Sequence, residues 1–286
     1  MTEAEFAASR RFAETPFGRI AYVERGAGPV ALFFHGAFLN GFQWRDVLEA
    51  CADERRCIAF DSLGHGHTEP LAGQPADLGA QAEAAAALLD ALGVDRVDLV
   101  GNDSGGGIAQ VFAVRHPGRV RSLCLTDCEV YTNNPAPGFL PIIEAFRAGG
   151  GPEIVASLQD PAFARSQAAF GPFYERPDEL RAETLTAYLA PLAAPERADA
   201  FVRFVASLAT PHTVEIAAAL RRLEAPALIA WGTADVGFEL KWAYWLAGAL
   251  PRARPVVEVE GARLFWPEER PELLSGLLRE HWAAAA

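Results

Sequence analysis

Short, mostly apolar runs recur along the chain, separated by longer segments whose apolar residues follow a helical spacing. Runs of this length, bounded by glycine, proline and aspartate, are typical of strands buried on both faces of a sheet. The predicted strands are Val30–Phe34, Cys57–Phe60, Val97–Val100, Val120–Thr126, Ala227–Trp231 and Pro255–Val259, preceded by two short strands within Phe12–Glu24. The predicted helices between them include Gln43–Cys51, Leu78–Leu92, Gly106–His116, Thr213–Leu223 and Glu239–Leu250. Because strands and helices alternate, we expect an α/β fold with a mostly parallel sheet and helices on both faces.

The alternation stops between residues 131 and 210. This segment is rich in proline, glycine and alanine and has only helical periods, which predict the helices Ile142–Arg147, Glu153–Gln159, Pro161–Ala169, Glu179–Leu189 and Glu196–Leu208. It is either a helical insertion carried by the α/β core or a set of further core helices.

Composition and charge narrow the class of protein. The 286 residues, 51% of them apolar, suit one globular α/β domain with an insertion. The net charge of −12 argues against nucleic acid and anionic membranes as partners, and it says little about the substrate, because the charge at a pocket is a local matter. No apolar run is long enough to span a membrane, and the first residues lack a signal-peptide core, so a cytoplasmic location is expected. The four cysteines lack metal-ligand spacing, and we predict reduced thiols, no metal and no cofactor.

The strand Val97–Val100 runs directly into Gly101-Asn102-Asp103-Ser104-Gly105, and a helix follows. A strand, a Gly-x-x-x-Gly turn and a helix form a nucleophile elbow, whose central side chain is pushed above the sheet. The two glycines are needed because a Cβ there would collide with the neighbouring strand and helix. The central residue is Asp103, so the reactive group is predicted to be a carboxylate. The alternative is a glycine-rich turn without chemistry.

On these residues the chain resembles the α/β-hydrolase superfamily, in the aspartate-nucleophile branch that contains epoxide hydrolases and haloalkane dehalogenases. The resemblance covers nearly the whole chain. It includes the His35-Gly36-Ala37-Phe38 turn, the segment Asp61–Thr68, which is similar to D-x-x-G-x-G-x-S/T, and Trp231–Asp235, which is similar to W-G-x-x-D. It implies an α/β-hydrolase core of residues 1–130 and 211–286 and an inserted α-helical cap of residues 131–210, whose inner wall makes the substrate pocket.

The resemblance also implies roles for matching positions. Asp103 is the nucleophile, and Asp235 is the carboxylate that orients a catalytic histidine. The N–H groups of Ala37 or Phe38 and of Ser104 form the oxyanion hole. A histidine in the turn after the third strand is a structural residue beside the pocket, so His35 is not expected to be the base.

The catalytic histidine is missing. It should follow the last strand in a turn resembling G-x-G-H-F-x-x-x-E, and Gly261–Glu269 matches that turn on both sides of the expected position. The residue at that position is Leu264, beside Phe265. His212 is the candidate for a relocated base. It either points into the pocket or is a polar residue in the first turn of a helix, and the second interpretation is favoured.

Other departures concern the substrate. Haloalkane dehalogenases hold the halide with a tryptophan after the nucleophile and a second donor after the HG turn, and these places are occupied by Ser104 and Ala37. Epoxide hydrolases polarise the epoxide oxygen with cap tyrosines. The predicted pocket residues are His35, Trp44, Tyr131, Tyr174, Tyr188, Leu264 and Phe265.

We therefore predict a hydrolase most like an epoxide hydrolase, acting on a small, largely apolar substrate through Asp103. Two alternatives stay open. One is a cofactor-free lyase or isomerase in which Asp103 acts as an acid or base, and the other is a ligand-binding pseudo-hydrolase without turnover.

Overall fold

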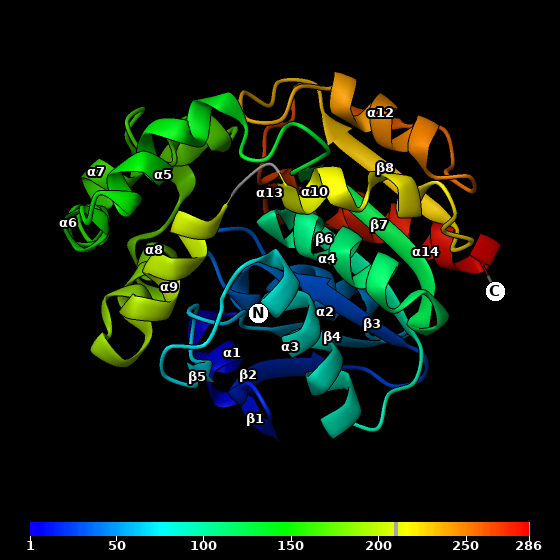
Figure 1. Ribbon diagram of the computed structural model, residues 1–286, viewed down its shortest axis with the longest axis horizontal. Coiled ribbons are helices and arrows are strands. Elements are labelled where there is room, and N and C mark those ends of the chain that lie inside the picture. The colour runs from blue at the N-terminus through cyan, green and yellow to red at the C-terminus, as the bar shows by residue number, and fades with distance from the viewer. Residues whose placement is uncertain (209–210, 286) are drawn as a thin grey trace.

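The computed structural model describes residues 1–208 and 211–285, whose strands form a single sheet (Figure 1). The nine-stranded sheet has the order β1-β2-β4-β3-β6-β7-β8-β9, with β5 paired to β2. Its strands are β1 (Arg11–Thr15), β2 (Gly18–Arg25), β3 (Val30–Phe34), β4 (Arg56–Phe60), β5 (Glu69–Pro70), β6 (Val97–Asp103), β7 (Val120–Cys128), β8 (Ala227–Gly232) and β9 (Val257–Val259). Neighbouring strands pair in parallel along β4, β3, β6, β7, β8 and β9. Strand β2 pairs antiparallel with β1, β4 and β5. The predicted mostly parallel sheet is confirmed.

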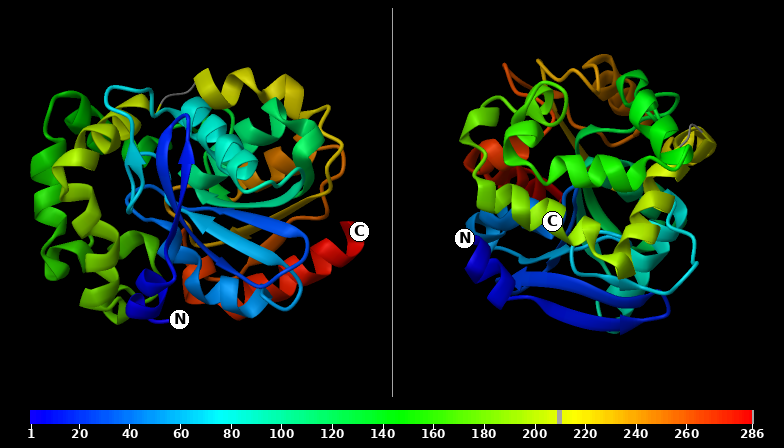
Figure 2. Two further views of the ribbon diagram at one scale, coloured as in Figure 1. Left: turned by 90° about the horizontal axis from the view of Figure 1, so that it is seen from below. Right: turned by 90° about the vertical axis from the view of Figure 1, so that its left-hand side faces the viewer.

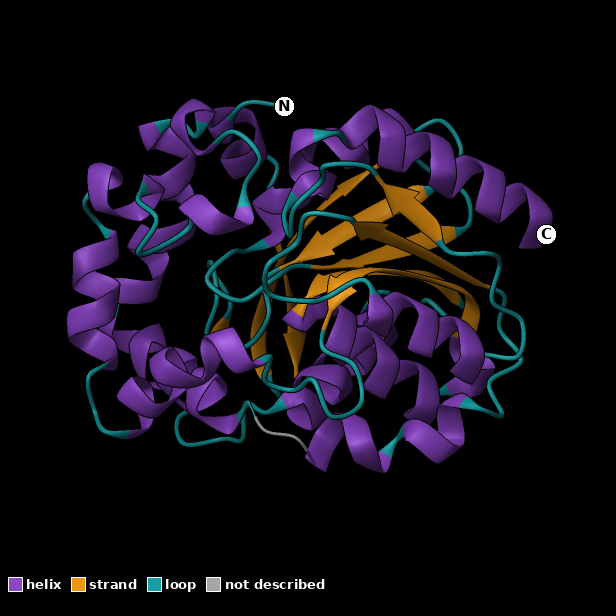
Figure 3. Ribbon diagram, turned by 90° about the horizontal axis from the view of Figure 1, so that it is seen from above, coloured by secondary structure: helices purple, strands orange, loops and turns teal. Residues whose placement is uncertain are grey.

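Helices cover both faces of the sheet (Figure 3). Helices α2 and α14 pack together on one face, and α3 and α4 on the other. The helices of the core are α1 (Glu3–Ala8), α2 (Arg45–Cys51), α3 (Leu78–Ala91), α4 (Ser104–Arg115), α10 (Pro211–Glu215), α11 (Ala217–Leu220), α12 (Lys241–Ala249), α13 (Trp266–Glu269) and α14 (Pro271–Ala285). Short 3₁₀ turns are η1 (Gly41–Trp44), η2 (Pro117–Arg119), η3 (Pro137–Phe139), η4 (Gly171–Phe173), η5 (Pro177–Glu179) and η6 (Ala190–Ala193).

The central strand β6 lies between β3 and β7, and all seven of its residues are buried. A parallel strand covered by helices on both faces has no solvent side, so even Asp98 is buried, and it pairs with Arg55 and Arg121. Helix α4 starts at Ser104, immediately after the strand, rather than at Gly106 as predicted. The elbow is therefore at the centre of the sheet, where two buried elements meet at one residue.

Between β7 and β8 the chain forms the helices α5 (Leu140–Arg147), α6 (Gly151–Leu158), α7 (Pro161–Arg165), α8 (Ala182–Leu189) and α9 (Pro195–Ser207). These helices stand together at one end of the core in two perpendicular views (Figures 1 and 2). The segment contributes no strand to the sheet among its described residues. The predicted end of the cap at Thr210 lies outside the described residues.

Some local predictions were wrong. The single helix predicted over Thr213–Leu223 is two short helices, α10 and α11, separated at Ile216. Helix α1 was not predicted from the sequence, although Thr2 and Glu5 form a capping box at its start. In the described part of the chain, the model contains no helix whose length and apolar character would let it cross a membrane.

Candidate active site

Asp103 occupies the sharp turn between β6 and α4, with φ 55° and ψ −133°. A non-glycine residue at positive φ is strained, and such residues cluster at functional sites. The flanking glycines permit the turn. A Cβ on Gly101 would lie 2.7 Å from the Gly105 oxygen, and one on Gly105 would lie 2.2 Å from the Phe34 oxygen. The backbone therefore has the geometry of a nucleophile elbow centred on Asp103.

The Asp103 carboxylate is held by backbone donors. Its Oδ2 accepts a hydrogen bond from the N–H of Ala37 over 2.8 Å, and the Ser104 N–H also stabilises the charged form. Burial nevertheless raises the pKa of Asp103 to about 7, and the nearby Asp235 charge adds to the rise. Of the two alternatives for the first oxyanion donor, Ala37 makes this bond, and the ring of Phe38 lines the cavity instead.

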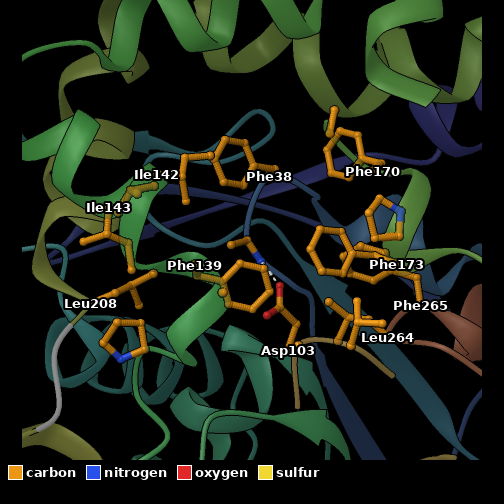
Figure 4. A pocket seen from close by; sticks show the side chains of 18 of the residues that line it. Phe38, Asp103, Phe139, Ile142, Ile143, Phe170, Phe173, Leu208, Leu264 and Phe265 are labelled. Atoms are coloured by element: carbon orange, nitrogen blue, oxygen red, sulfur yellow. Dashed lines mark hydrogen bonds between the residues drawn. The ribbon is translucent and has the colours of Figure 1, made fainter. Parts of the chain in front are cut away.

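A cavity of about 400 Å³ opens above Asp103 (Figure 4), and the helices α5, α6 and α9 contribute residues to its wall. Its wall is largely aromatic and aliphatic, and the carboxylate of Asp103 points into it. The main apolar lining residues are Phe38, Phe139, Ile142, Ile143, Phe170, Phe173, Leu208, Leu264 and Phe265. Asp103, Glu129 and Gln167 supply the polar side chains of the described lining, which contains no arginine, lysine or histidine. The cavity suits a small, mostly apolar ligand.

Asp235 belongs to a buried pair of carboxyl groups. Its Oδ1 accepts from the N–H of Gly237 over 2.7 Å, and burial raises the pKa of Asp235 to about 6. Burial and the proximity of Asp235 raise the pKa of Asp127 well above its usual value. Asp127 accepts from the Gly232 N–H over 2.9 Å and from Nε1 of Trp266 over 2.7 Å. Because two close carboxylates resist double ionisation, this pair holds a proton at neutral pH.

Leu264 stands where the histidine would be, and its side chain lines the cavity beside Asp103 (Figure 4). The turn is nevertheless fixed to the elbow, because Nδ2 of Asn102 donates to the Leu264 oxygen over 3.0 Å. The turn that the sequence predicts for the base thus presents an aliphatic side chain to the cavity. Phe265, also predicted at the pocket, lines the same cavity.

All six histidines lie in the described part of the chain, and none lines the cavity. His35 is buried beneath the turn, where its Nε2 accepts from the Ser62 N–H over 3.0 Å. The proton must then be on Nδ1, which donates to the Gly36 oxygen over 2.8 Å. His35 is structural, as predicted, but it is not a pocket residue. His212 lies in α10 and is not brought to the cavity wall.

The predicted pocket tyrosines do not line the cavity. Tyr174 and Tyr188 are buried and donate to Glu268 over 2.8 and 2.7 Å, and Arg45 pairs with the same carboxylate at 2.6 Å. A buried carboxylate needs such donors, and this requirement directs both phenols away from the cavity. Tyr131 is likewise outside the cavity lining, stacked on Trp245 with ring centroids 4.8 Å apart.

Trp44 is a core residue rather than a pocket residue. It is fully buried and packs on Phe33 with ring centroids 5.4 Å apart. A tryptophan near a predicted site carries a large apolar surface, and burial in the core is the more favourable use of it.

Two acidic residues of the site were missed in the sequence. Asp127 and Glu129 lie at the end of β7, where the pattern Thr126-Asp127-Cys128-Glu129 puts carboxylates directly after a buried strand. Glu129 is 3% exposed and lines the cavity. Burial and the charge of Asp103 raise the pKa of Glu129 well above its usual value. In the described residues no group of three potential ligands is arranged to hold a metal ion.

Comparison with known proteins agrees with the fold. A family model described as the alpha/beta hydrolase fold matches residues 29–148. Haloalkane dehalogenase 2 of Mycobacterium tuberculosis (strain ATCC 25618 / H37Rv) is 28% identical over 280 residues, which cover 95% of this chain and 94% of that protein. The soluble epoxide hydrolase of Corynebacterium sp. (strain C12) is 27% identical over 271 residues, with 90% and 91% covered.

A solved structure, the epoxide hydrolase CorEH without ligand, superimposes with a TM-score of 0.82 at 22% identity, covering 97% of this chain and 99% of that one. The predicted α/β-hydrolase fold is therefore confirmed, and so is the predicted enzyme class, because the relatives are named hydrolases.

Proposed function

We propose that this protein is an epoxide-hydrolase-type enzyme whose Asp103 attacks an electrophilic carbon of a small, largely apolar substrate. The observation that carries the proposal is the Asp103 carboxylate itself. One of its oxygens is held by the Ala37 N–H, and the group points into an apolar cavity (Figure 4). A carboxylate fixed in this way, with substrate held above it, can form an ester by displacement.

An epoxide fits the site better than a halide. The positions that dehalogenases use for halide donors are Ser104 and Ala37, and the N–H of Ala37 is engaged by Asp103. The cavity lining offers no tryptophan among its described residues. A departing halide would therefore lack the tryptophan donor that dehalogenases use.

In the proposed first step, a lone pair of Asp103 forms a bond to an epoxide carbon, and the carbon–oxygen bond breaks. The second step is hydrolysis of this ester by water, which needs a base. Leu264 cannot remove a proton, so the ester is expected to persist unless another group activates water. We therefore expect the substrate to alkylate Asp103 quickly and the resulting ester to be hydrolysed slowly.

A second function is favoured by one specific observation. The pKa of Asp103 is raised to about 7, so near neutral pH the protonated and ionised forms coexist. A group with this pKa is suited to general acid–base catalysis, as in a cofactor-free lyase or isomerase that never forms an ester.

Intact-mass measurement with a panel of small epoxides separates the two functions. The wild type is expected to gain the mass of one epoxide on Asp103, and Asp103→Asn is expected to gain none. Chemical conversion of substrate without any adduct, lost in Asp103→Asn, would support acid–base catalysis and contradict the ester.

A further inference from the structure

Opening an epoxide by a carboxylate leaves a negative charge on the departing oxygen, and this oxygen needs a proton donor. The buried phenols near the cavity are not available for this role. Tyr174 and Tyr188 both donate to Glu268, at 2.8 and 2.7 Å. If epoxide opening is the reaction, the donor must come from another group on the cavity wall.

The described cavity lining contains three polar side chains: Asp103, Glu129 and Gln167. Asp103 is the attacking group. Gln167 is exposed, in the segment between α7 and η4, where solvent competes for its amide. The N–H of Ala37 already donates to Asp103. Glu129 is therefore the buried polar side chain on this wall that has no other assignment.

Glu129 is placed beside the nucleophile by the sheet. Cys128 pairs with Asp103 in the register of β6 and β7, and Glu129 is the next residue along the chain. Its main chain is anchored because Nε2 of Gln110 donates to its carbonyl oxygen over 2.8 Å. Its side chain packs on α4 at Gly107, where a Cβ would come within 3.3 Å of Oε2.

The carboxyl group of Glu129 is buried and incompletely bonded. Oε2 has no hydrogen-bond partner in the described structure, and the residue is 3% exposed. An ionised oxygen without a partner is costly in free energy at such a buried place, so the unpartnered Oε2, which lies against α4, favours the protonated form of this cavity-lining residue.

Resting on the epoxide-opening function, we propose that Glu129 is the acid that protonates the departing oxygen. Asp103 forms its bond to the epoxide carbon, and the carbon–oxygen bond breaks with its electron pair going to the oxygen. That oxygen takes the proton from the Glu129 carboxyl. The products of this step are a hydroxyalkyl ester on Asp103 and a carboxylate on Glu129.

The surroundings of Glu129 keep its proton in place before the reaction. The ionisable groups that act on it are the Asp103 carboxylate, at the end of β6, and the neighbouring Cys128 thiol, whose pKa burial also raises. On the side of Glu129 that faces the helices, the neighbouring residues are Gly107 of α4 and Leu78 of α3, and both are uncharged. With no cation in the described lining, both the low polarity and the negative charge favour the neutral acid.

The test compares two alkylating probes of equal length, 1,2-epoxyhexane and 1-bromohexane, by the rate at which each adds to Asp103. Bromide leaves as an anion without a proton, whereas the epoxide oxygen needs one. In Glu129→Gln, the epoxide rate is expected to fall about 10²-fold or more, as loss of a general acid implies, with the bromide rate unchanged. Glu280→Gln, the same change at an exposed residue of α14 outside the cavity lining, is expected to leave both rates within about twofold of the wild-type rates.

An epoxide rate in Glu129→Gln that equals the wild-type rate would overturn the role of Glu129 and leave the proposed function intact. An equal loss with both probes would also overturn it, because it indicates disturbed geometry. Absence of any adduct on the wild type would overturn the proposed function and this role together.

A measurement on the wild type alone covers the case in which Glu129→Gln does not fold. The rate with the epoxide is expected to decline at alkaline pH, as Glu129 loses its proton, because burial and the Asp103 charge raise the pKa of Glu129 well above its usual value. The rate with the bromide is expected to stay level. An epoxide rate that stays level up to about pH 10 would overturn the role of Glu129.

Discussion

The side-chain amide of Asn102 donates to the carbonyl oxygen of Leu264 over 3.0 Å, and so ties the last turn of the core to the elbow. The amide oxygen of Asn102 accepts in turn from Nε2 of Gln43 over 2.7 Å. Leu264 is thereby fixed at the cavity wall by Asn102, which directly precedes Asp103 in the chain. If Asp103 is the nucleophile, as proposed, position 264 is where a base could be introduced.

Leu264→His is expected to shorten the lifetime of an ester on Asp103, because an imidazole at this position can activate water. General-base assistance is typically worth about 10² to 10⁴ in rate. The measurement is the decay of the adduct mass after removal of excess epoxide. Leu264→Met, which has a similar volume and no base, is the matched control and should leave the lifetime unchanged. Rapid multiple turnover by the wild type, with no adduct, would contradict this prediction.

His212→Ala tests whether His212 serves as the base in place of a histidine at position 264. The structure leaves His212 off the cavity wall, so we expect turnover and adduct lifetime to be the same in this variant and in the wild type. The readout is the adduct mass over time. Trapping of an adduct only in His212→Ala would show that His212 reaches the ester, in disagreement with the structure.

Asp103→Asn is expected to abolish reaction while the protein stays folded, since the side chains have nearly the same shape. Ser104→Ala should be milder, because the N–H of Ser104 supports Asp103 and the substitution keeps it. A serine-directed fluorophosphonate probe should not label the wild type. Loss of activity in Ser104→Ala with retention in Asp103→Asn would show that the elbow has been assigned to the wrong residue.

The raised pKa of Asp103 predicts a pH-dependent stability. The folded protein binds this proton more tightly than the unfolded chain, so Asp103 lowers stability progressively as pH rises from about 4 to about 7. Asparagine cannot ionise, so Asp103→Asn should gain about 2–3 kcal/mol relative to the wild type between pH 5 and pH 7, at about 1.4 kcal/mol per pKa unit. Urea unfolding at both pH values measures the difference. Parallel pH dependence of the two proteins would contradict it.

Tyr174→Phe and Tyr188→Phe test the reassignment of the two phenols. Each removes one donor from the buried Glu268 carboxylate and should destabilise the protein by about 1–3 kcal/mol. Adduct formation with an epoxide should stay within about twofold of the wild-type rate, because neither residue lines the cavity. A large loss of epoxide reactivity, with little change in stability, would restore the tyrosines as substrate donors.

Replacement of residues 131–210 with a short linker should leave a folded sheet domain, because the sheet and the helices α2, α3, α4 and α14 lie outside this segment. Substrate selectivity should change, since the cavity loses the wall formed by Ile142, Phe170 and Leu208. Circular dichroism and cooperative unfolding provide the measurement. A replacement protein that is globally unfolded would show that the helices belong to the core.

Prediction from the sequence succeeded where local pattern and backbone sterics decide the outcome. The strand Val30–Phe34 has the predicted bounds, and the elbow has its strained residue at Asp103. Ala37, Phe38, Leu264 and Phe265 were placed near the site by motifs that follow a strand directly, and all four line the cavity. The ends of parallel strands meet at one edge of the sheet, so residues tied closely to those ends are easy to place.

Residues far from a strand end were placed less well. Tyr174 and Tyr188 belong to the helical segment, and the direction of each phenol depends on Glu268, about 80 to 94 residues away along the chain. Such pairings are set by the need of a buried charge for donors, which has no local signature in the sequence.

The sequence by itself determined the alternating α/β fold, the carboxylate at the elbow and the absence of a histidine at position 264, because periodicity, glycine spacing and residue identity are all local properties. Only the tertiary structure decided that Asp127 pairs with Asp235, that the tyrosines serve Glu268 and that Glu129 faces the cavity. The physical reason is desolvation. Which carboxyl group keeps its proton, and which donor it finds, depends on the charges and dipoles that folding brings together from distant parts of the chain.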